Sequence, residues 1–163
     1  MKIIYLAGGC FWGVQAYYDK LNGIIETIVG YANGNISNPK YEQVKSHEAT
    51  HAETVKVIYD ENVISLTKIL EHFLRFVDPY ELNHQGEDYG IQYRSGVYYT
   101  YENELKLIKD YFNQIDKENK FKIEVLPLEN FYDAETYHQK YLDKNPGGYC
   151  HVNLSLLKDN ERK

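Results

Sequence analysis

A short apolar run that ends in two glycines and a cysteine restricts the possible folds of this chain more than any other feature. Residues 2–7 have the composition of a buried strand, and Gly8-Gly9 interrupts it. Residues 11–21 then carry apolar side chains at helical spacing. The sequence therefore predicts a strand, a tight turn and a helix, with Cys10 at the start of the helix.

The rest of the 163-residue chain alternates between strand-like and helix-like patterns. Strands are predicted over residues 24–31, 51–59, 93–101 and 121–126. Helices are predicted over residues 66–77, over residues 134–142, and over a segment that buries Leu105, Ile108, Phe112 and Ile115. This order predicts an α+β fold, a two-layer sandwich with a ferredoxin-like core in which helices pack on a mixed β-sheet. We expect a single domain over residues 1–163, with an irregular tail from about residue 143.

Composition and charge exclude several classes of protein. Hydrophobic residues make up 43% of the chain and charged residues 26%, which are ordinary values for a soluble globular protein. The net charge of -6 disfavours nucleic acid as a partner, because phosphate binding needs a basic stripe. The apolar stretch over residues 3–7 is too short for a signal peptide. We therefore expect a cytoplasmic protein with no membrane role, in which Cys10 and Cys150 do not form a stable structural disulfide.

Two side chains are candidates for chemistry on local grounds alone. Cys10 begins a predicted helix, where unpaired backbone N–H groups and the helix dipole favour a thiolate. The alternative is a small buried residue in a tight turn, and the residues themselves leave both readings open. Glu53 shares a strand face with apolar residues, where desolvation raises the pKa of a carboxyl. The alternative for Glu53 is an ion pair with a lysine or arginine at the edge of the sheet.

Short motifs along nearly the whole chain resemble those of one enzyme family. The run Gly9-Cys10-Phe11-Trp12-Gly13 resembles the active-site signature of the A-type peptide methionine sulfoxide reductases. Other segments are similar to motifs of that family and follow in the same order: Gly30-Tyr31-Ala32, Asn38-Pro39-Lys40-Tyr41-Glu42, His51-Ala52-Glu53, Gln85-Gly86 with Asp88, and Gln92-Tyr93-Arg94-Ser95. Near the C-terminus, three more resemble the segment that bears a recycling cysteine: Phe131-Tyr132 with Ala134-Glu135, Tyr137-His138-Gln139, and Asn145-Pro146-Gly147-Gly148-Tyr149-Cys150. Chance agreement of so many ordered motifs is negligible.

The resemblance implies an oxidoreductase that repairs oxidative damage, a peptide-methionine (S)-S-oxide reductase. On this reading, Cys10 attacks the sulfoxide sulfur of the S epimer. Glu53, Tyr31 and Tyr93 hold and protonate the sulfoxide oxygen, and Asp88 lies beside them. The chemistry agrees, because a sulfoxide oxygen leaves only after it gains a proton, and this needs an acid that keeps its proton near neutral pH.

The resemblance also implies how the enzyme binds its substrate and how it is recycled. Phe11 and Trp12 form the wall that accepts the methyl group of methionine sulfoxide, either free or in proteins and peptides. Cys150 in the tail converts the sulfenic acid of Cys10 into an intramolecular disulfide. Thioredoxin or another dithiol then reduces this disulfide. We expect a monomeric catalytic domain that requires neither a metal nor a bound cofactor.

The chain departs from the family pattern in several loops. Asn33, His47 and Thr50 lie where glycine is common in relatives, so loop shape and substrate access are expected to differ. His84 lies where arginine is frequent, and the charge of that loop should therefore depend on pH.

Other functions are open on sequence grounds. A cysteine hydrolase would pair Cys10 with His51 or His138, which leaves Glu53 and Cys150 without a role. A thiol peroxidase would use both cysteines, and a redox-sensing or peptide-binding module would oxidise Cys10 without forming a product. Two distant cysteines and scattered histidines do not have the spacing of a zinc site.

Overall fold

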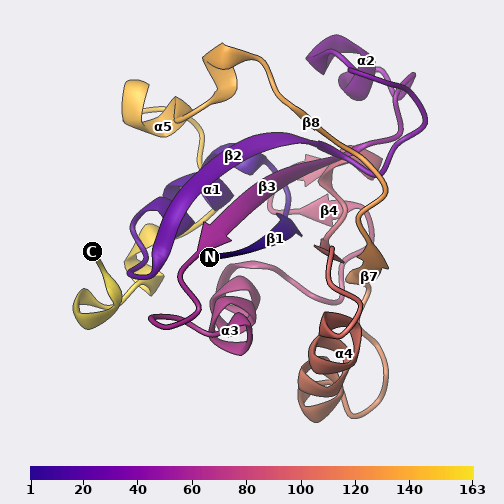
Figure 1. Ribbon diagram of the computed structural model, residues 1–163. Helices are drawn as coiled ribbons and strands as arrows, with labels where there is room; N and C mark the ends of the chain where they lie inside the picture. Colours follow the sequence, from indigo (N-terminus) through magenta and orange to yellow (C-terminus); the bar gives the residue numbers. More distant parts are fainter.

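The computed structural model describes residues 1–163 and is built around a six-stranded sheet (Figure 1). The first part of the chain forms β1 (Lys2–Ala7), α1 (Phe11–Asp19), β2 (Ile24–Ala32), β3 (Ala52–Tyr59), α3 (Leu66–Phe76) and β6 (Gly96–Tyr99). Two further strands, β7 (Glu124–Pro127) and β8 (Phe131–Asp133), extend the sheet to the order β7-β6-β1-β3-β2-β8. Its inner part, β6-β1-β3-β2, is the split βαβ arrangement of a ferredoxin-like core. Neighbouring strands are antiparallel except for β6 and β7, so the predicted mixed sheet is confirmed.

The remaining elements are short or lie outside this core (Figure 1). The hairpin strands are β4 (His84–Gln85) and β5 (Asp88–Tyr89), and the other helices are α2 (Tyr41–Lys45), α4 (Glu104–Ile115) and α5 (Tyr141–Lys144). Single 3₁₀ turns occur at Ile91–Tyr93, Thr136–His138, Leu154–Leu156 and Asp159–Glu161. None of the helices has the length and apolar character needed to cross a membrane.

The two faces of the sheet are buried in different ways, because successive strand residues point to opposite sides. Val55 and Val57 belong to a core of 29 buried residues, which α1 and α3 share from the same side of the sheet. Tyr5 and Tyr98 belong to a separate cluster of 5 buried residues on the other face. Glu53 lies two residues before Val55, so its carboxyl points to the side of the sheet that carries the helices.

The local predictions hold best in the first half of the chain. The strands predicted over residues 2–7, 24–31 and 51–59 match β1, β2 and β3 to within one residue at each end. The strand predicted from Tyr93 is wrong at its start, because Tyr93 ends a 3₁₀ turn and β6 begins only at Gly96. Gly90, with φ of 141°, redirects the chain there. Ile115, predicted to be buried, is 46% exposed because it lies in the last turn of α4.

The helix predicted over residues 134–142 is also wrong. The chain forms a 3₁₀ turn and then α5, and Lys140 separates them with φ of 55°. The preceding strand β8, which was not predicted, pairs with the edge of β2. Contacts between distant residues override the local helical pattern, since the side chain of Gln139 bonds the backbone N–H and carbonyl of Val29 at 3.0 and 2.8 Å.

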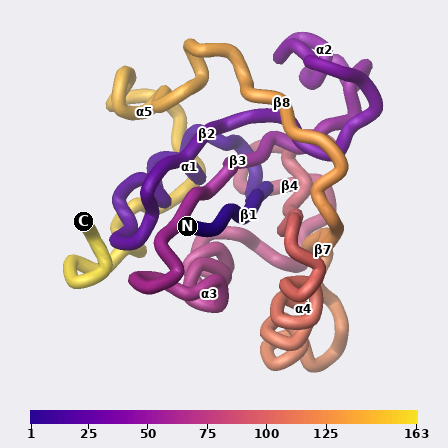
Figure 2. The backbone as a smooth tube through the Cα atoms, viewed as in Figure 1, coloured from indigo at the N-terminus to yellow at the C-terminus, as the bar shows by residue number.

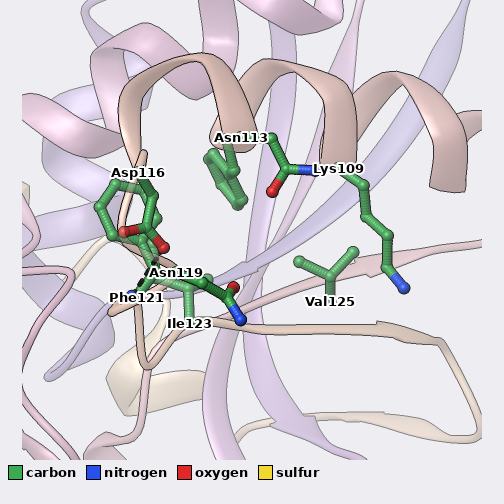
Figure 3. A pocket seen from close by; sticks show the side chains of 8 residues that line it. Lys109, Asn113, Asp116, Asn119, Phe121, Ile123 and Val125 are labelled. Atoms are coloured by element: carbon green, nitrogen blue, oxygen red, sulfur yellow. Dashed lines mark hydrogen bonds between the residues drawn. The ribbon is translucent and has the colours of Figure 1, made fainter.

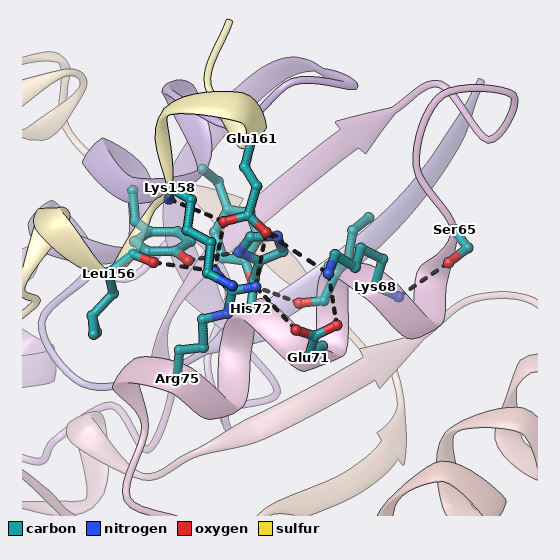
Figure 4. Close-up of polar contacts among 11 residues, drawn as sticks. Ser65, Lys68, Glu71, His72, Arg75, Leu156, Lys158 and Glu161 are labelled. Carbon is teal, nitrogen blue, oxygen red and sulfur yellow. Dashed lines mark hydrogen bonds and ion pairs between the residues drawn. The ribbon is translucent and has the colours of Figure 1, made fainter.

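The tail predicted to be irregular from about residue 143 includes the end of α5 and the two last 3₁₀ turns, whereas residues 145–153 contain no helix or strand. This part is held at both ends. Before it, Lys140 Nζ lies 2.8 and 2.9 Å from the two carboxylate oxygens of Asp19. After it, Arg75 of α3 donates hydrogen bonds of 2.7 and 2.8 Å to Glu161 (Figure 4). Figure 2 shows this last segment, drawn in yellow, beside α1, and the backbone N–H of Lys163 bonds the carbonyl that follows α1. Ion pairs therefore hold the chain both before and after this segment.

Candidate active site

A small cavity of about 130 Å³ lies at the N-terminal end of α1. Its walls come from the starts of α1, α2 and β3, the β4–β5 hairpin with the turn after it, and the C-terminal part of the chain. The residues that line it are Cys10, Phe11, Trp12, Tyr41, Glu53, Asp88, Tyr93, His138 and Tyr149. The structure thus brings together all the predicted site residues except Tyr31 and Cys150.

A larger cavity of about 390 Å³ lies between α4 and β7 (Figure 3). It contains none of the predicted site residues and no thiol. Its one carboxylate, Asp116, accepts the backbone N–H groups of Lys120 and Phe121 and thereby shapes the loop after α4. Size alone does not make this cavity the reactive one, so the smaller cavity around Cys10 is the candidate active site.

Cys10 occupies the N-cap position of α1 and is buried, with 8% of its surface exposed. Burial raises the pKa of its thiol, and the nearby carboxyl of Glu53 raises it further. The expectation of a thiolate favoured by the helix N-terminus is therefore wrong for the resting protein. A backbone hydrogen bond from Trp12 at the helix start lowers the pKa of Cys10, but burial and Glu53 outweigh it. The surroundings of Cys10 therefore favour the thiol over the thiolate.

Glu53 lies at the start of the inner strand β3 and is 3% exposed. It forms no ion pair, so the alternative of a carboxylate paired at the sheet edge is wrong. Burial raises the pKa of the Glu53 carboxyl to about 8, and the hydrogen bond from Phe11 only partly opposes this. The group is consequently protonated at neutral pH, as a proton donor must be.

Tyr31, a predicted site residue, is not among the residues that line the cavity. Its side chain is fully buried, and its hydroxyl donates a 2.8 Å hydrogen bond to Glu135 Oε1. The other oxygen of Glu135 accepts the backbone N–H of Tyr41, also at 2.8 Å. Of these two tyrosines, Tyr41 lines the cavity, and Tyr31 is linked to its backbone through the carboxylate of Glu135. The signal for Tyr41 was present in the motif that contains it, but nothing local distinguishes the two rings.

Tyr93 and Asp88 both line the cavity, as predicted. Burial raises the pKa of the Tyr93 hydroxyl, and the carboxyls of Glu53 and Asp88 add to the effect, so this group stays a hydrogen-bond donor. Asp88 Oδ2 accepts a 3.0 Å hydrogen bond from the hydroxyl of Tyr149. Asp88 thereby ties the residue before Cys150 to the mouth of the cavity.

Phe11 and Trp12 give the cavity an apolar wall. Phe11 is 1% exposed, and Trp12 stacks on Tyr141 with ring centroids 3.7 Å apart. The indole Nε1 of Trp12 donates to His138 Nδ1 at 3.1 Å. His138, which also lines the cavity, was considered on sequence grounds only as the base of a hydrolase. Because its Nδ1 accepts the hydrogen bond from the Trp12 N–H, His138 orients the indole ring.

Cys150 lies next to the cavity and not in its lining. Both cysteines are free thiols, and Cys150 is partly buried. Its Sγ donates to the carbonyl of Val152 at 3.1 Å. A Cβ atom placed on Gly13 would stand 3.0 Å from this Sγ, so the thiol rests on the first turn of α1. The two thiols therefore lie at the same end of one helix.

The unusual loop residues adopt the conformations that glycine would allow. Asn33 and His47 have φ of 54° and 67°, in the left-handed region that favours glycine. Both residues therefore have a backbone conformation that glycine adopts without strain. His84 bonds Glu81 at 2.9 Å and the carbonyl of Gly86 at 2.6 Å, and the Glu81 contact raises its pKa. Its charge depends on pH, as expected from the sequence.

The arrangement defines a class of protein: an oxidoreductase that uses a cysteine thiol beside an acid that keeps its proton, with a second free thiol close by. No cluster of three or more histidine, cysteine or acidic side chains is placed to hold a metal ion. His51, one of the two possible bases for a hydrolase, is packed against Gly34, since a Cβ there would lie 2.0 Å from its ring. His51 is therefore not placed to act as a base for Cys10.

Comparison with known proteins identifies the family. The model of the family described as peptide methionine sulfoxide reductase matches residues 2–163. A peptide methionine sulfoxide reductase MsrA of Ureaplasma urealyticum is 56% identical over 162 residues, which cover 97% of each chain. The reduced form of Mxr1 from Saccharomyces cerevisiae is 40% identical with a TM-score of 0.87, covering 93% of this chain and 91% of that one. A structure of Mxr1 in complex with Trx2 is 30% identical with a TM-score of 0.60, over 86% of this chain and 84% of that one.

The chain belongs to the peptide methionine sulfoxide reductase family. Its activity is the thiol-dependent reduction of methionine sulfoxide to methionine, and it is an oxidoreductase of the peptide-methionine (S)-S-oxide reductase type. The predicted function and α+β fold are both confirmed. The rival readings as a hydrolase, a peroxidase or a non-catalytic sensor are not needed to explain the site.

Proposed function

We propose that Cys10 attacks the sulfur of methionine sulfoxide while Glu53 donates a proton to the oxygen. The sulfur–oxygen bond of the substrate breaks, methionine leaves, and the oxygen is transferred to Cys10, which becomes a sulfenic acid, while the proton of the Cys10 thiol restores Glu53. The observation that carries this proposal is the buried carboxyl of Glu53, which has no cationic partner. It accepts the backbone N–H of Phe11, the residue that follows the buried thiol of Cys10. Such an acid has its proton available in the pH range where the enzyme must work.

Two tyrosines complete the binding of the oxygen in this proposal. Tyr41 and Tyr93 line the cavity on the side of Glu53, and both hydroxyls have raised pKa values because they are buried near Glu53. They can therefore donate hydrogen bonds as negative charge develops on the oxygen. Asp88 shapes the cavity mouth, and Tyr31 acts only by supporting Tyr41 through Glu135.

The apolar wall of Phe11 and Trp12 accounts for the selection of one epimer. With the methyl group against these rings and the oxygen held by Glu53, the opposite epimer would direct its oxygen or its chain into the wall. The cavity of about 130 Å³ holds only the end of a side chain, so the rest of a peptide would stay outside it. This is compatible with both free and protein-bound methionine sulfoxide as substrates.

The cycle closes through Cys150 and an external dithiol. The sulfenic acid of Cys10 condenses with the thiol of Cys150 to form a disulfide and one molecule of water. The place of Cys150 on the first turn of α1 supports this step. Thioredoxin is the proposed reductant, in line with the relative Mxr1, which has been crystallised with Trx2. We expect a single catalytic domain that works as a cytoplasmic monomer without a metal or a bound cofactor.

Racemic methionine sulfoxide with dithiothreitol tests the proposal. The protein should consume half of the racemate and leave the R epimer, whereas the Cys10→Ser variant should consume neither. Chromatography of the resolved epimers gives the answer. Equal rates for both epimers would contradict the pocket, and turnover by Cys10→Ser would contradict the nucleophile.

A further inference from the structure

The segment that carries Cys150 has almost no backbone support. None of the backbone N–H groups of residues 149–153 donates to another backbone carbonyl. The segment is held by side chains instead: Tyr149 bonds Asp88, and Cys150 bonds the carbonyl of Val152 within the segment. Neither contact joins the segment to the turn that carries Cys10. Cys150 and Val152 pack on Gly13 of α1, but this packing contact does not bond the segment to the turn itself.

His151 makes that connection. Its Nε2 lies 2.8 Å from the carbonyl oxygen of Gly8, two residues before Cys10. A carbonyl oxygen can only accept, so Nε2 carries the proton and donates it. Burial lowers the pKa of His151, which keeps the ring neutral near pH 7 and leaves Nδ1 unprotonated. The bond therefore has a defined direction in the working protein.

Glycines on both sides make room for the imidazole ring. A Cβ atom on Gly9 would stand 2.9 Å from His151 Nε2, and one on Gly86 would stand 3.2 Å from the Cβ of His151. Both glycines have positive φ, 88° and 60°. The side chain is thus enclosed in a slot between the turn before Cys10 and the β4–β5 hairpin. The adjacent Cys150 is placed at the same time over Gly13.

We propose that His151 is a positioning residue for recycling: it fastens the Cys150 segment to the Gly8–Gly9 turn, so that the two sulfurs meet as soon as Cys10 is oxidised. The inference rests on the proposed role of Cys150. The step it assists is the condensation of Cys10 sulfenic acid with the Cys150 thiol, which forms the S–S bond and releases water. A tethered thiol gains rate because its encounter with the partner is already arranged. His151 does not line the substrate cavity, so the first reduction should not depend on it.

Two substitutions separate the hydrogen bond from the shape of the ring. His151→Phe fills the slot but cannot donate to Gly8, whereas His151→Gln keeps an N–H donor of similar reach. In a single turnover without reductant, both should release the first methionine at the wild-type rate. The Phe variant should then form the disulfide about tenfold more slowly, which corresponds to a barrier about 1.4 kcal/mol higher. The Gln variant should stay within about threefold of wild type.

Rapid quenching with a thiol reagent measures the disulfide, and dimedone traps the waiting sulfenic acid. More dimedone adduct on Cys10 in His151→Phe than in wild type is the expected sign. Disulfide formation at the wild-type rate in His151→Phe would overturn the inference, and so would equal slowing in His151→Gln. Failure of the proposed function looks different, because Cys150→Ser would then cycle with thioredoxin as fast as wild type.

Discussion

The two cysteines lie close together but are held by different means. Cys10 joins an inner strand to a helix, and β1 is paired with β3 on one side and β6 on the other. Cys150 lies in a tail without regular structure, fastened by side chains near it and by ion pairs beyond its two ends. Regular backbone pairing holds the first cysteine, and side-chain contacts hold the second. Chemistry and recycling should therefore respond to mutation separately.

Removal of the acid should produce the largest effect, and only on the Cys10 side. Glu53→Gln keeps the acceptor for the Phe11 N–H but loses the proton. The single-turnover rate of methionine formation should fall by about a hundredfold or more. Oxidation of Cys10 by added peroxide followed by disulfide formation should be much less affected, because that step does not use the acid. Rapid-quench measurements give the rates of both steps. An unchanged rate of methionine formation would mean that another group, and not Glu53, donates the proton.

The pH dependence follows from the raised pKa of Glu53, about 8. The acid is protonated below this value and ionised above it, so the first step should be constant near neutrality and then fall about tenfold per pH unit above pH 8. Glu53→Gln should lack this fall. A single-turnover rate that declines from pH 4 to 6 instead would show that the carboxyl is ionised in the working enzyme.

The raised pKa of Glu53 also predicts that the folded protein is less stable at high pH than at low pH. The folded-state value of Glu53 lies above its ordinary value of 4.5, so the folded protein binds the proton more tightly than the unfolded chain. The free energy of unfolding should therefore fall as pH rises from 4.5 towards 8. Glu53→Gln should remove this dependence and melt at least about 3 °C higher than wild type at pH 8. Thermal unfolding at pH 5 and pH 8 checks the sign.

Replacement of Tyr41 and of Tyr31 by phenylalanine tests which of the two hydroxyls acts on the substrate oxygen. Tyr41→Phe removes a hydroxyl from the cavity and should slow the first step about tenfold or more. Tyr31→Phe removes the bond to Glu135 and should slow it only about threefold, while it lowers the free energy of unfolding by about 1 kcal/mol. Single-turnover rates and urea denaturation compare the pair. A larger kinetic effect from Tyr31 would restore the prediction made from sequence.

The anchor of the tail should give the smallest effect. The side chains of Glu161 and Arg75 are 13% and 17% exposed. Glu161→Gln weakens the ion pair between them and should lower the free energy of unfolding by about 1 kcal/mol. The first methionine should appear at the wild-type rate, and disulfide formation should slow by about twofold at most. The exposed pair of Lys106 and Asp110 supplies the control, because Lys106→Gln should change neither quantity. Urea denaturation and thiol counting measure both.

Local patterns predicted the first region far better than the second. The strand, the glycine turn and α1 follow one another in sequence, and alternation along β3 alone places Glu53 among buried residues. The raised pKa of Cys10 could not be predicted, because it depends on burial by the whole site.

The features that local patterns did not predict have a common cause. The hydroxyl of Tyr31 is directed to Glu135, which is 104 residues away, and β8 pairs with the edge of β2. The path of the Cys150 tail depends on His151 reaching Gly8 across 143 residues. Contacts between such distant residues have no signature in a local pattern of apolar and polar side chains.

Counting thiols after one turnover tests most directly the claim that the two cysteines have separate tasks. Without reductant, the wild-type protein should yield about one methionine per chain and lose both free thiols. Cys150→Ser should yield the same first methionine, end as a sulfenic acid that dimedone traps, and lose its thioredoxin-driven turnover. If wild type keeps one free thiol after the turnover, or if Cys150→Ser cycles with thioredoxin at the wild-type rate, then Cys150 takes no part and the account is wrong.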